Sequence, residues 1–132
     1  MSWFAGQLRS RRGQVTVELA LILPVVVFML VAVLEGARAF TTFLDLHHAT
    51  REGVRVAVTH AADSAIEQAI YRAVPALDPE RLDITITPPK EQRRSGEPVT
   101  VTLTYEFPVV APFVFQDVLV IPLESTMTMR ME

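Results

Sequence analysis

The arrangement of apolar and polar residues along this chain changes twice. The stretch 19–34 contains no charged or polar side chain. From Phe40 to Ala61 apolar residues recur at steps of three, four and seven, and after Asp83 apolar and polar residues alternate with a period of two. A membrane-length apolar helix, an amphipathic helix and β-strands are therefore expected, in that order.

The apolar stretch has the length of a single membrane-spanning helix. From Gln14 to Leu34 there are about 21 residues, which as a helix at ~1.5 Å per residue extend roughly 31 Å, close to the ~30 Å of a bilayer core. Pro24 lies inside this helix, has no N–H and crowds the carbonyl of Ala20, so we expect a kink there. Two interpretations are open: a membrane helix that simply tolerates the proline, or a flexible point that eases transfer from the bilayer to a filament.

The residues before the apolar stretch are basic. Arg9, Arg11 and Arg12 are the only charged residues before Gly13. By the positive-inside rule, this places the N-terminus in the cytoplasm and the rest of the chain on the exported side. We expect three parts: a cytoplasmic leader (1–13), a transmembrane or filament-core half of the helix (14–34) and an exported stem and head (35–132).

Glu18 is unexpected at the edge of such a segment. Insertion scales give roughly 2.5 to 3.5 kcal/mol for a charged residue at a helix centre, so a carboxylate here is expected to have a task. A plain signal anchor explains the length and the basic flank but not Glu18. A secretory signal peptide is disfavoured because the apolar stretch exceeds the usual ~7 to 15 residues, and because Glu35 and Arg38 crowd its candidate cleavage site, Ala37 to Ala39.

The segment 11–19 resembles the prepilin-peptidase site of type IV pilin-like proteins. In that family cleavage follows a glycine, and a glutamate stands at the fifth mature position. Gly13 and Glu18 occupy these positions if Gln14 comes first, although the best-known pilins usually begin with an aromatic residue. The resemblance implies cleavage between Gly13 and Gln14. The carboxylate of Glu18, about one helical turn along, can then neutralise the new α-amino group of the same or the next subunit.

The amphipathic stretch predicts that the first helix continues well beyond the membrane. Its apolar face is expected to carry Phe40, Phe43, Leu44, His47, Val54, Ala57, Val58 and Ala61. A break is expected near Ala61, where Ser64 and Glu67 form a capping-box start for a short second helix that ends at Pro75.

The alternating pattern predicts three strands, at 83–87, 99–107 and 119–131, with a charged loop at 88–98. Pro122 indicates that the third strand is an edge strand or is bulged. An antiparallel sheet would bury one face on the two helices. The expected fold class is therefore α+β, with a long N-terminal membrane-spanning, pilin-like helix, a short second helix and a small three-stranded antiparallel sheet.

Composition excludes several classes of protein. A chain of 132 residues has room for one membrane segment and one small domain. It has no cysteine, so disulfides and thiolate sites are excluded. The net charge is −3, and without residues 1–13 and their three arginines it becomes −3 − 3 = −6. An acidic body argues against a nucleic-acid partner.

The sequence shows no recognisable catalytic or cofactor site. Its only lysine, Lys90, lies in a proline-flanked loop, and no nucleophile with a matching base is apparent. His47 and His48 are adjacent, so on a helix they point about 100° apart, and with His60 they do not complete a metal-ligand set. We expect no enzyme activity, cofactor, metal or small-molecule substrate.

A group of charged residues on the stem has two interpretations. Arg51, Glu52 and Arg55 are candidates for contacts with an adjacent subunit, or they form local ion pairs on a solvated helix face, worth a few tenths of a kcal/mol each. Gly53 either permits close helix packing or is a weak point, because a helix glycine costs up to ~1 kcal/mol against alanine.

Taken in order, the leader and anchor and the motifs at 35–38, 49–55 and 129–132 resemble TadE-like proteins, the minor pilins or pseudopilins of tight-adherence (Tad) pili. The resemblance implies processing by a prepilin peptidase and a role in the assembly or composition of an adhesive pilus. The implied partners are other pilin and minor pilin subunits, the assembly machinery of the inner membrane, and membrane lipid. The alternative is a bitopic envelope module that binds or senses something and never enters a filament.

Overall fold

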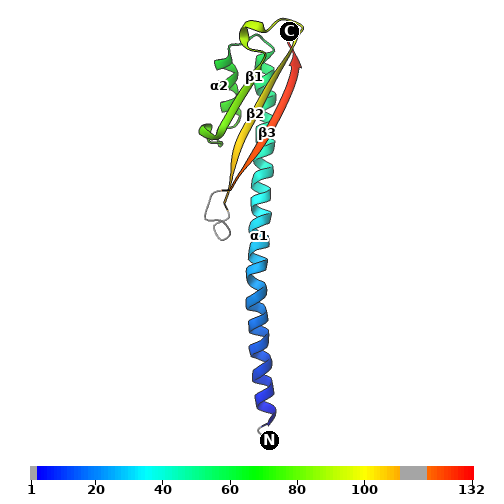
Figure 1. Cartoon of the computed structure of the whole chain (residues 1–132), viewed down its shortest axis with the longest axis vertical. Coiled ribbons are helices and arrows are strands. Elements are labelled where there is room, and N and C mark those ends of the chain that lie inside the picture. The colour runs from blue at the N-terminus through cyan, green and yellow to red at the C-terminus, as the bar shows by residue number, and fades with distance from the viewer. Residues whose placement is uncertain (1–2, 111–118) are drawn as a thin grey trace. The chain divides into compact units, whose positions relative to one another are not determined.

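The computed structural model describes residues 3–110 and 119–132, with side chains from Gly13 onward. Two compact units are present, an N-terminal unit (1–36) and a head (37–132). Helix α1 contributes residues to both units. The elements are α1 (Trp3–Ala57), α2 (Asp63–Ala73), β1 (Leu82–Thr87), β2 (Pro98–Val109) and β3 (Leu119–Arg130), with short 3-10 helices at Pro79–Arg81 and Lys90–Gln92 (Figure 1).

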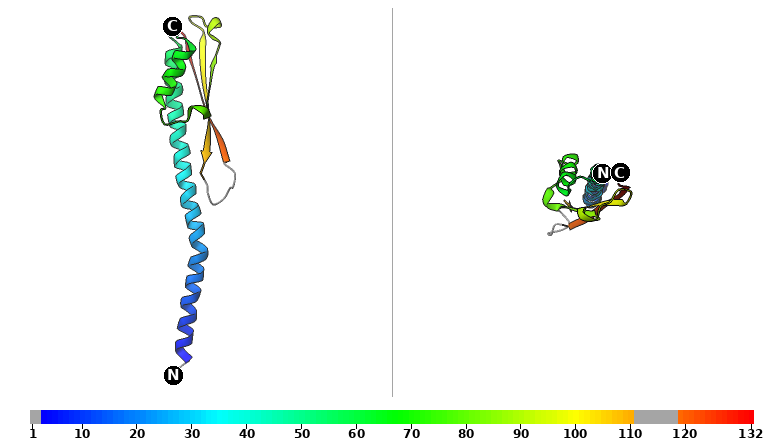
Figure 2. Two further views of the ribbon diagram at one scale, coloured as in Figure 1. Left: turned by 90° about the vertical axis from the view of Figure 1, so that its left-hand side faces the viewer. Right: turned by 90° about the horizontal axis from the view of Figure 1, so that it is seen from above.

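The predicted α+β fold is confirmed: a long N-terminal apolar helix, a short second helix and a three-stranded antiparallel sheet. The strand order is β1-β2-β3, so β3 with Pro122 is an edge strand, as predicted. The register pairs Ile84 with Leu103, and Val101 with Met127. Within the head, α2 and the sheet lie on different sides of α1 (Figure 2).

The two faces of the sheet differ in chemistry. The face toward the helices carries the core residues of β2, which are Val99, Val101, Leu103, Tyr105 and Phe107. The outer face carries threonines, and these bond across the strands: Thr100 to Thr128 at 2.8 Å and Thr102 to Thr126 at 3.1 Å between the hydroxyl oxygens. The period of two in the sequence therefore produces one apolar and one hydroxyl-rich face.

The predicted apolar face of the stem is correct only in its C-terminal half. Val54, Ala57 and Val58 are buried, but Phe40, Phe43 and Leu44 are exposed. The packed face is instead rich in small residues, and it includes Ala39, Thr42, Leu46, Ala49, Thr50, Gly53, Val54 and Ala57. Small side chains let the sheet and α2 approach the helix closely, and this outweighs the larger apolar area of the phenylalanines.

Gly53 shows how close this approach is. A Cβ atom at this position would lie 2.8 Å from both Cγ1 and Cδ1 of Ile70 on α2, and 3.5 Å from Cγ1 of Val101 on β2. These distances support the interpretation that Gly53 permits close packing.

The predicted capping box at Ser64 is wrong. Helix α2 begins at Asp63, and the residue before it, Ala62, has no side chain that can cap the helix. The first turn closes instead through the carbonyl of Ala62, which accepts from the N–H groups of Ala65 at 2.9 Å and Ile66 at 3.2 Å. Asp63 is then in the first turn, where an acidic side chain is favourable.

A buried arginine from the loop between β1 and β2 holds the turn between the helices. The side chain of Arg93 is 2 % exposed, and its Nη2 lies 2.6 Å from Oδ1 of Asp63, an ion-pair distance without hydrogen-bond geometry. Its Nε donates to the carbonyl of Pro88 at 3.0 Å and its Nη1 to that of Ala61 at 3.4 Å. Arg93 therefore ties the sheet side of the head to the start of α2.

Candidate functional site

The candidate cleavage site lies in the N-terminal part of α1. Gly13, Gln14 and Glu18 are all exposed, and nothing lies within 4 Å of where a Cβ on Gly13 would be. Together with Val17 and Leu21, these residues line one shallow hollow on the helix surface. The geometry therefore places Gln14 and Glu18 on one helix face, one turn apart.

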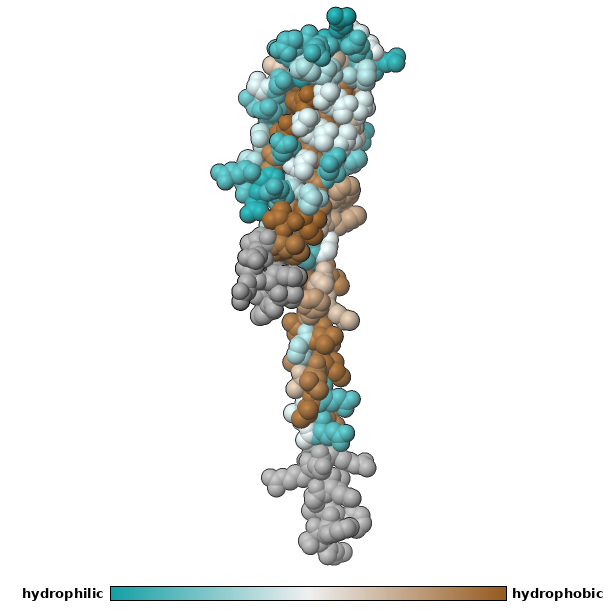
Figure 3. Space-filling view, in the orientation of Figure 1, coloured by the Kyte–Doolittle hydropathy of each residue, from teal (hydrophilic) through white to brown (hydrophobic). Residues whose placement is uncertain are grey.

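The helix that follows is apolar on all sides. Its large apolar side chains from Val15 to Leu30 are 43 to 72 % exposed, and they form the brown surface of the N-terminal unit in Figure 3. A helix that is hydrophobic all round is typical of a membrane span or a large core. By length and composition this helix can cross a membrane once. It continues past Pro24 without interruption, and the kink expected there stays a prediction.

The charged residues of the stem, Arg51, Glu52 and Arg55, lie on the part of α1 that belongs to the head. Nε and Nη2 of Arg55 donate to Oε2 of Glu52 at 3.1 and 3.0 Å, which is the local ion pair of a solvated face. Arg51 is exposed next to this pair. A contact of these three residues with another subunit stays a prediction.

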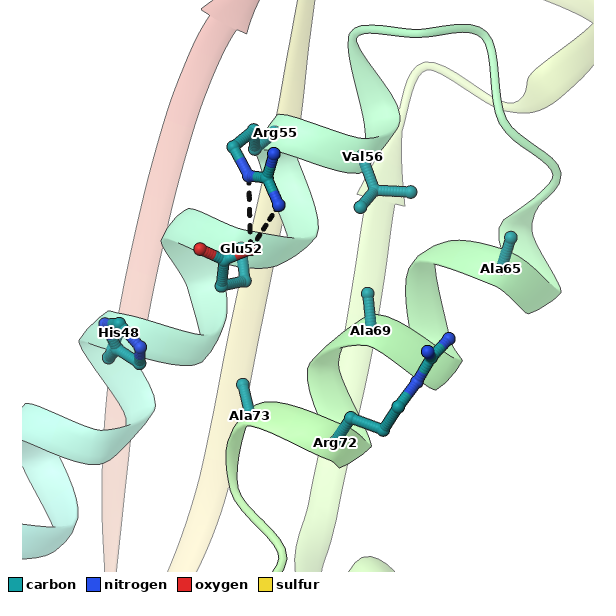
Figure 4. A pocket seen from close by; sticks show the side chains of 8 residues that line it. All are labelled: His48, Glu52, Arg55, Val56, Ala65, Ala69, Arg72 and Ala73. Carbon is teal, nitrogen blue, oxygen red and sulfur yellow. Dashed lines mark hydrogen bonds and ion pairs between the residues drawn. The ribbon is translucent and has the colours of Figure 1, made fainter.

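Glu52 and Arg55 also border a groove of about 470 Å³ between α1 and α2 (Figure 4). Its α2 wall consists of small residues one turn apart, Ala65, Ala69 and Ala73, with Arg72 beside them. Polar groups from both helices line this groove. The sequence did not predict this groove, because it depends on how α2 packs beside α1.

His47 and His60 make contacts with different parts of the head. Nδ1 of His47 is 3.3 Å from Oγ of Ser125 on β3, and Nε2 of His60 is 3.0 Å from the carbonyl oxygen of Glu132. Among the residues from Gly13 to Val110 and from Leu119 to Glu132, no cluster of three His, Cys, Asp or Glu side chains could hold a metal ion.

Two features of the head were not predicted from the sequence. Arg93 was assigned to a charged loop, and only its contacts with Asp63, Ala61 and Pro88 reveal its buried position. The second feature is a set of exposed apolar residues where β2 ends and β3 begins. The apolar composition of 107–110 and 119–122 was a signal that could have identified it.

One comparison with known proteins gives a match. The family model described as TadE-like protein matches residues 13–55. Residues 13–55 are TadE-like. No curated protein and no solved structure matches the chain. The TadE-like match starts at Gly13, ends at Arg55, and contains every candidate site residue proposed from the sequence.

The match confirms the predicted TadE-like resemblance over this segment and supports a pilin-like protein associated with a Tad pilus. TadE-like proteins are pilin-like and structural rather than enzymatic, and they associate with pilus components. The exposed apolar helix and the match together fit a single-pass, membrane-anchored protein.

Proposed function

We propose that this chain is a minor pilin or pseudopilin of a Tad-type adhesive pilus, made as a precursor and cut by a prepilin peptidase between Gly13 and Gln14. The observation that carries the proposal is that the TadE-like match begins at Gly13, and that Glu18 follows Gln14 by one turn on the same helix face. An uncharged apolar helix of membrane length comes directly afterwards.

The proposed cleavage and the charge pairing that follows it involve only Gly13, Gln14 and Glu18 of this chain. Hydrolysis of the Gly13–Gln14 bond leaves a carboxylate on Gly13 and a new α-amino group on Gln14. An α-amino group has a typical pKa of about 7.7 to 8.0, so it is mostly protonated at neutral pH. The carboxylate of Glu18 then pairs with this charge in the same subunit or the next, which offsets the cost of a lone carboxylate at the membrane edge.

The helical state of the site also matters. The bond to be cut lies inside α1, so it must leave the helix to enter a peptidase. Gly13 favours this step, since glycine is less favourable than alanine in a helix by about 1 kcal/mol. A small residue there also leaves the surface open.

The proposal assigns a location to each part of the chain. Residues 1–13 form the cytoplasmic leader, 14–34 span the inner membrane until they enter a filament core, and 35–132 are exported. The partners are the prepilin peptidase, other pilin and minor pilin subunits, and the pilus assembly machinery. Arg51, with the Glu52–Arg55 pair, is the proposed contact surface on the stem.

A pair of carboxylate variants tests the role of Glu18. Glu18→Gln keeps the size and hydrogen bonding of the side chain and removes only the charge. Glu35→Gln, at the other end of the apolar stretch, is the matched control. We expect Glu18→Gln to insert in the membrane as wild type does but to copurify less with partner pilins and to be depleted from sheared filaments, while Glu35→Gln retains both. Normal filament levels for Glu18→Gln would refute the pairing role.

A bitopic binding module is the second candidate function, and the groove between α1 and α2 favours it. The two functions differ in destination. A pilin-like protein is found in sheared surface filaments, whereas a bitopic module stays entirely in the membrane fraction.

A further inference from the structure

The described residues where β2 ends and β3 begins are apolar and largely exposed. We call these residues the hairpin tip: Val109, Val110, Leu119, Val120 and Ile121. The exposed fractions are 54 % for Val110, 46 % for Leu119, 39 % for Val120 and 42 % for Ile121. Figure 3 shows a brown, apolar area on the head below a teal and white surface.

The hairpin tip is apolar on both faces of the sheet. Side chains alternate along a strand, so Val120 lies on the outer face with Thr126 and Thr128, while Leu119 and Ile121 lie on the opposite face. Further along β3 the two faces differ, with threonines outside and the half-buried Leu123 and Met127 inside. Only at the tip does the outer face also become apolar, so burial against the helices does not explain it.

The tip is bounded by carboxylates. Within the described residues, no charged side chain occurs between Glu106 and Val110 or between Leu119 and Glu124. Glu106 and Glu124 lie at the boundary, since Glu106 pairs with Pro122, and Glu124 pairs with Thr104. Among the described residues, the sheet therefore changes within about two residues from an acidic, hydroxyl-rich surface to the uncharged apolar side chains of the hairpin tip.

The tip lies at the end of the head where the chain enters from the apolar stretch. Cζ of Arg38 is 5.2 Å from the centroid of the Phe107 ring, which fixes the end of β2 beside the first turn of the head's part of α1. Arg38 is only four residues after Leu34, the last residue of the uncharged stretch. In the same part of α1, Phe40, Phe43 and Leu44 are also exposed.

We propose that the hairpin tip inserts into the interface of the lipid bilayer, as a second membrane contact of the anchored chain. Immersion in lipid covers both faces of a hairpin at once, whereas docking on a protein surface covers one. Interfacial segments of proteins bury their apolar residues at the boundary between headgroups and acyl chains. The flanking Glu106 and Glu124 then remain at the level of the headgroups. The inference rests on single-pass anchorage alone, and neither cleavage at Gly13 nor filament assembly is needed for it.

Tryptophan reporters in the full-length, uncleaved chain test this contact. Trp3 is the only tryptophan, so Trp3→Phe provides a silent background. Val120→Trp places a reporter on the outer face of the tip, and Thr128→Trp places the matched control on the same face of the same strand, about 27 Å away at ~3.4 Å per residue. Each variant is reconstituted in phosphatidylcholine vesicles with or without brominated acyl chains.

We expect the emission of Val120→Trp to shift to shorter wavelength and to be lost when the lipid is brominated, whereas Thr128→Trp is quenched by aqueous iodide and not by bromine. Val110→Trp should behave like Val120→Trp. If the far-ultraviolet circular dichroism of Val120→Trp departs from that of wild type, Val110→Trp is used in its place. Quenching of both tip reporters by iodide and not by bromine would overturn the inference. Protection of both from bromine and iodide would also overturn it and would assign the tip to a contact with another subunit.

Discussion

In the N-terminal unit the large apolar side chains from Val15 to Leu30 are exposed, whereas in the head those of Leu46, Ile66, Ile70 and Leu103 are completely buried. The apolar surface of the first unit can be covered only by something outside the chain, either lipid or other subunits. These core residues of the head are covered by its own sheet and helices. Helix α1 supplies both kinds of surface.

This difference separates two kinds of information in the sequence. The residues proposed for processing and pairing, Gly13, Gln14 and Glu18, need no tertiary contact to be in place, because a single helix positions them. The residues that stabilise the head act through partners far away in the sequence, as Arg93 does with Asp63. Substitutions in the two units should therefore affect different properties.

The largest effect is expected for a pair of leucines two residues apart on α1. Leu46 is fully buried and Leu44 is 51 % exposed. Leu46→Ala should lower the free energy of unfolding of the head by about 2 to 5 kcal/mol, because it leaves a cavity in a packed core. Leu44→Ala should change it by less than about 0.5 kcal/mol. Amide hydrogen exchange of β2, in the full chain in detergent micelles, measures both. Equal losses would mean that the buried face has been assigned incorrectly.

Removal of the buried arginine should have the next largest effect. Arg93→Ala takes the donors away from the part-buried carbonyls of Pro88 and Ala61, and each such hydrogen bond contributes about 0.5 to 1.5 kcal/mol. The side chain of Asp63 is 45 % exposed, but its Oδ1, which faces Arg93, is buried and also loses its ion pair. We expect a loss of about 1 to 3 kcal/mol, and exposed Arg94→Ala serves as the control. If the amide hydrogens of β2 exchange equally fast in both variants, Arg93 does not stabilise the contact between the sheet and the helices.

A smaller effect is expected at Gly53. Gly53→Ala places a methyl group 2.8 Å from two carbons of Ile70. Overpacking costs about 1 to 3 kcal/mol, and the better helix propensity of alanine returns up to about 1 kcal/mol. The net expectation is a loss of about 1 kcal/mol in β2 exchange. Gly36→Ala, with open space around its Cβ, should show none. A gain in stability for Gly53→Ala would indicate that Ile70 moves aside freely.

The smallest effect on the head is expected for the apolar helix. Leu23→Ala removes an exposed side chain of the N-terminal unit, and β2 exchange should stay within about 0.5 kcal/mol of wild type. A clear loss of protection in β2 would show that the two units do not separate as described.

Much of the fold followed from periodicity alone. The period of two located β1, β2 and β3 to within a few residues, and Pro122 correctly indicated an edge strand. The buried face of α1 was only half correct, because periodicity gives weight to large residues such as Phe40 and Phe43, while the helix packs through Ala49 and Gly53. A capping motif at Ser64 was also too weak to fix the start of α2.

The candidate site was more predictable than the head's surface. Gly13 and Glu18 are close in sequence, so helical geometry alone places them together. The groove between α1 and α2 joins Glu52 to Ala69 and Arg72, and the tip joins Val109 to Leu119. Such groups of residues are far apart in the sequence, and the path of the connecting loop brings them together. Local sequence patterns do not encode that path.

The most direct test of the proposed function is the N-terminus of the mature protein. Intact mass and N-terminal sequencing would be performed on protein from membranes and from sheared filaments of cells that contain the cognate prepilin peptidase. The account predicts a chain that starts at Gln14 in both fractions, and predicts that Gly13→Leu accumulates as precursor in the membrane. Recovery of only the full-length chain, or of a chain that starts at Phe40, would contradict it.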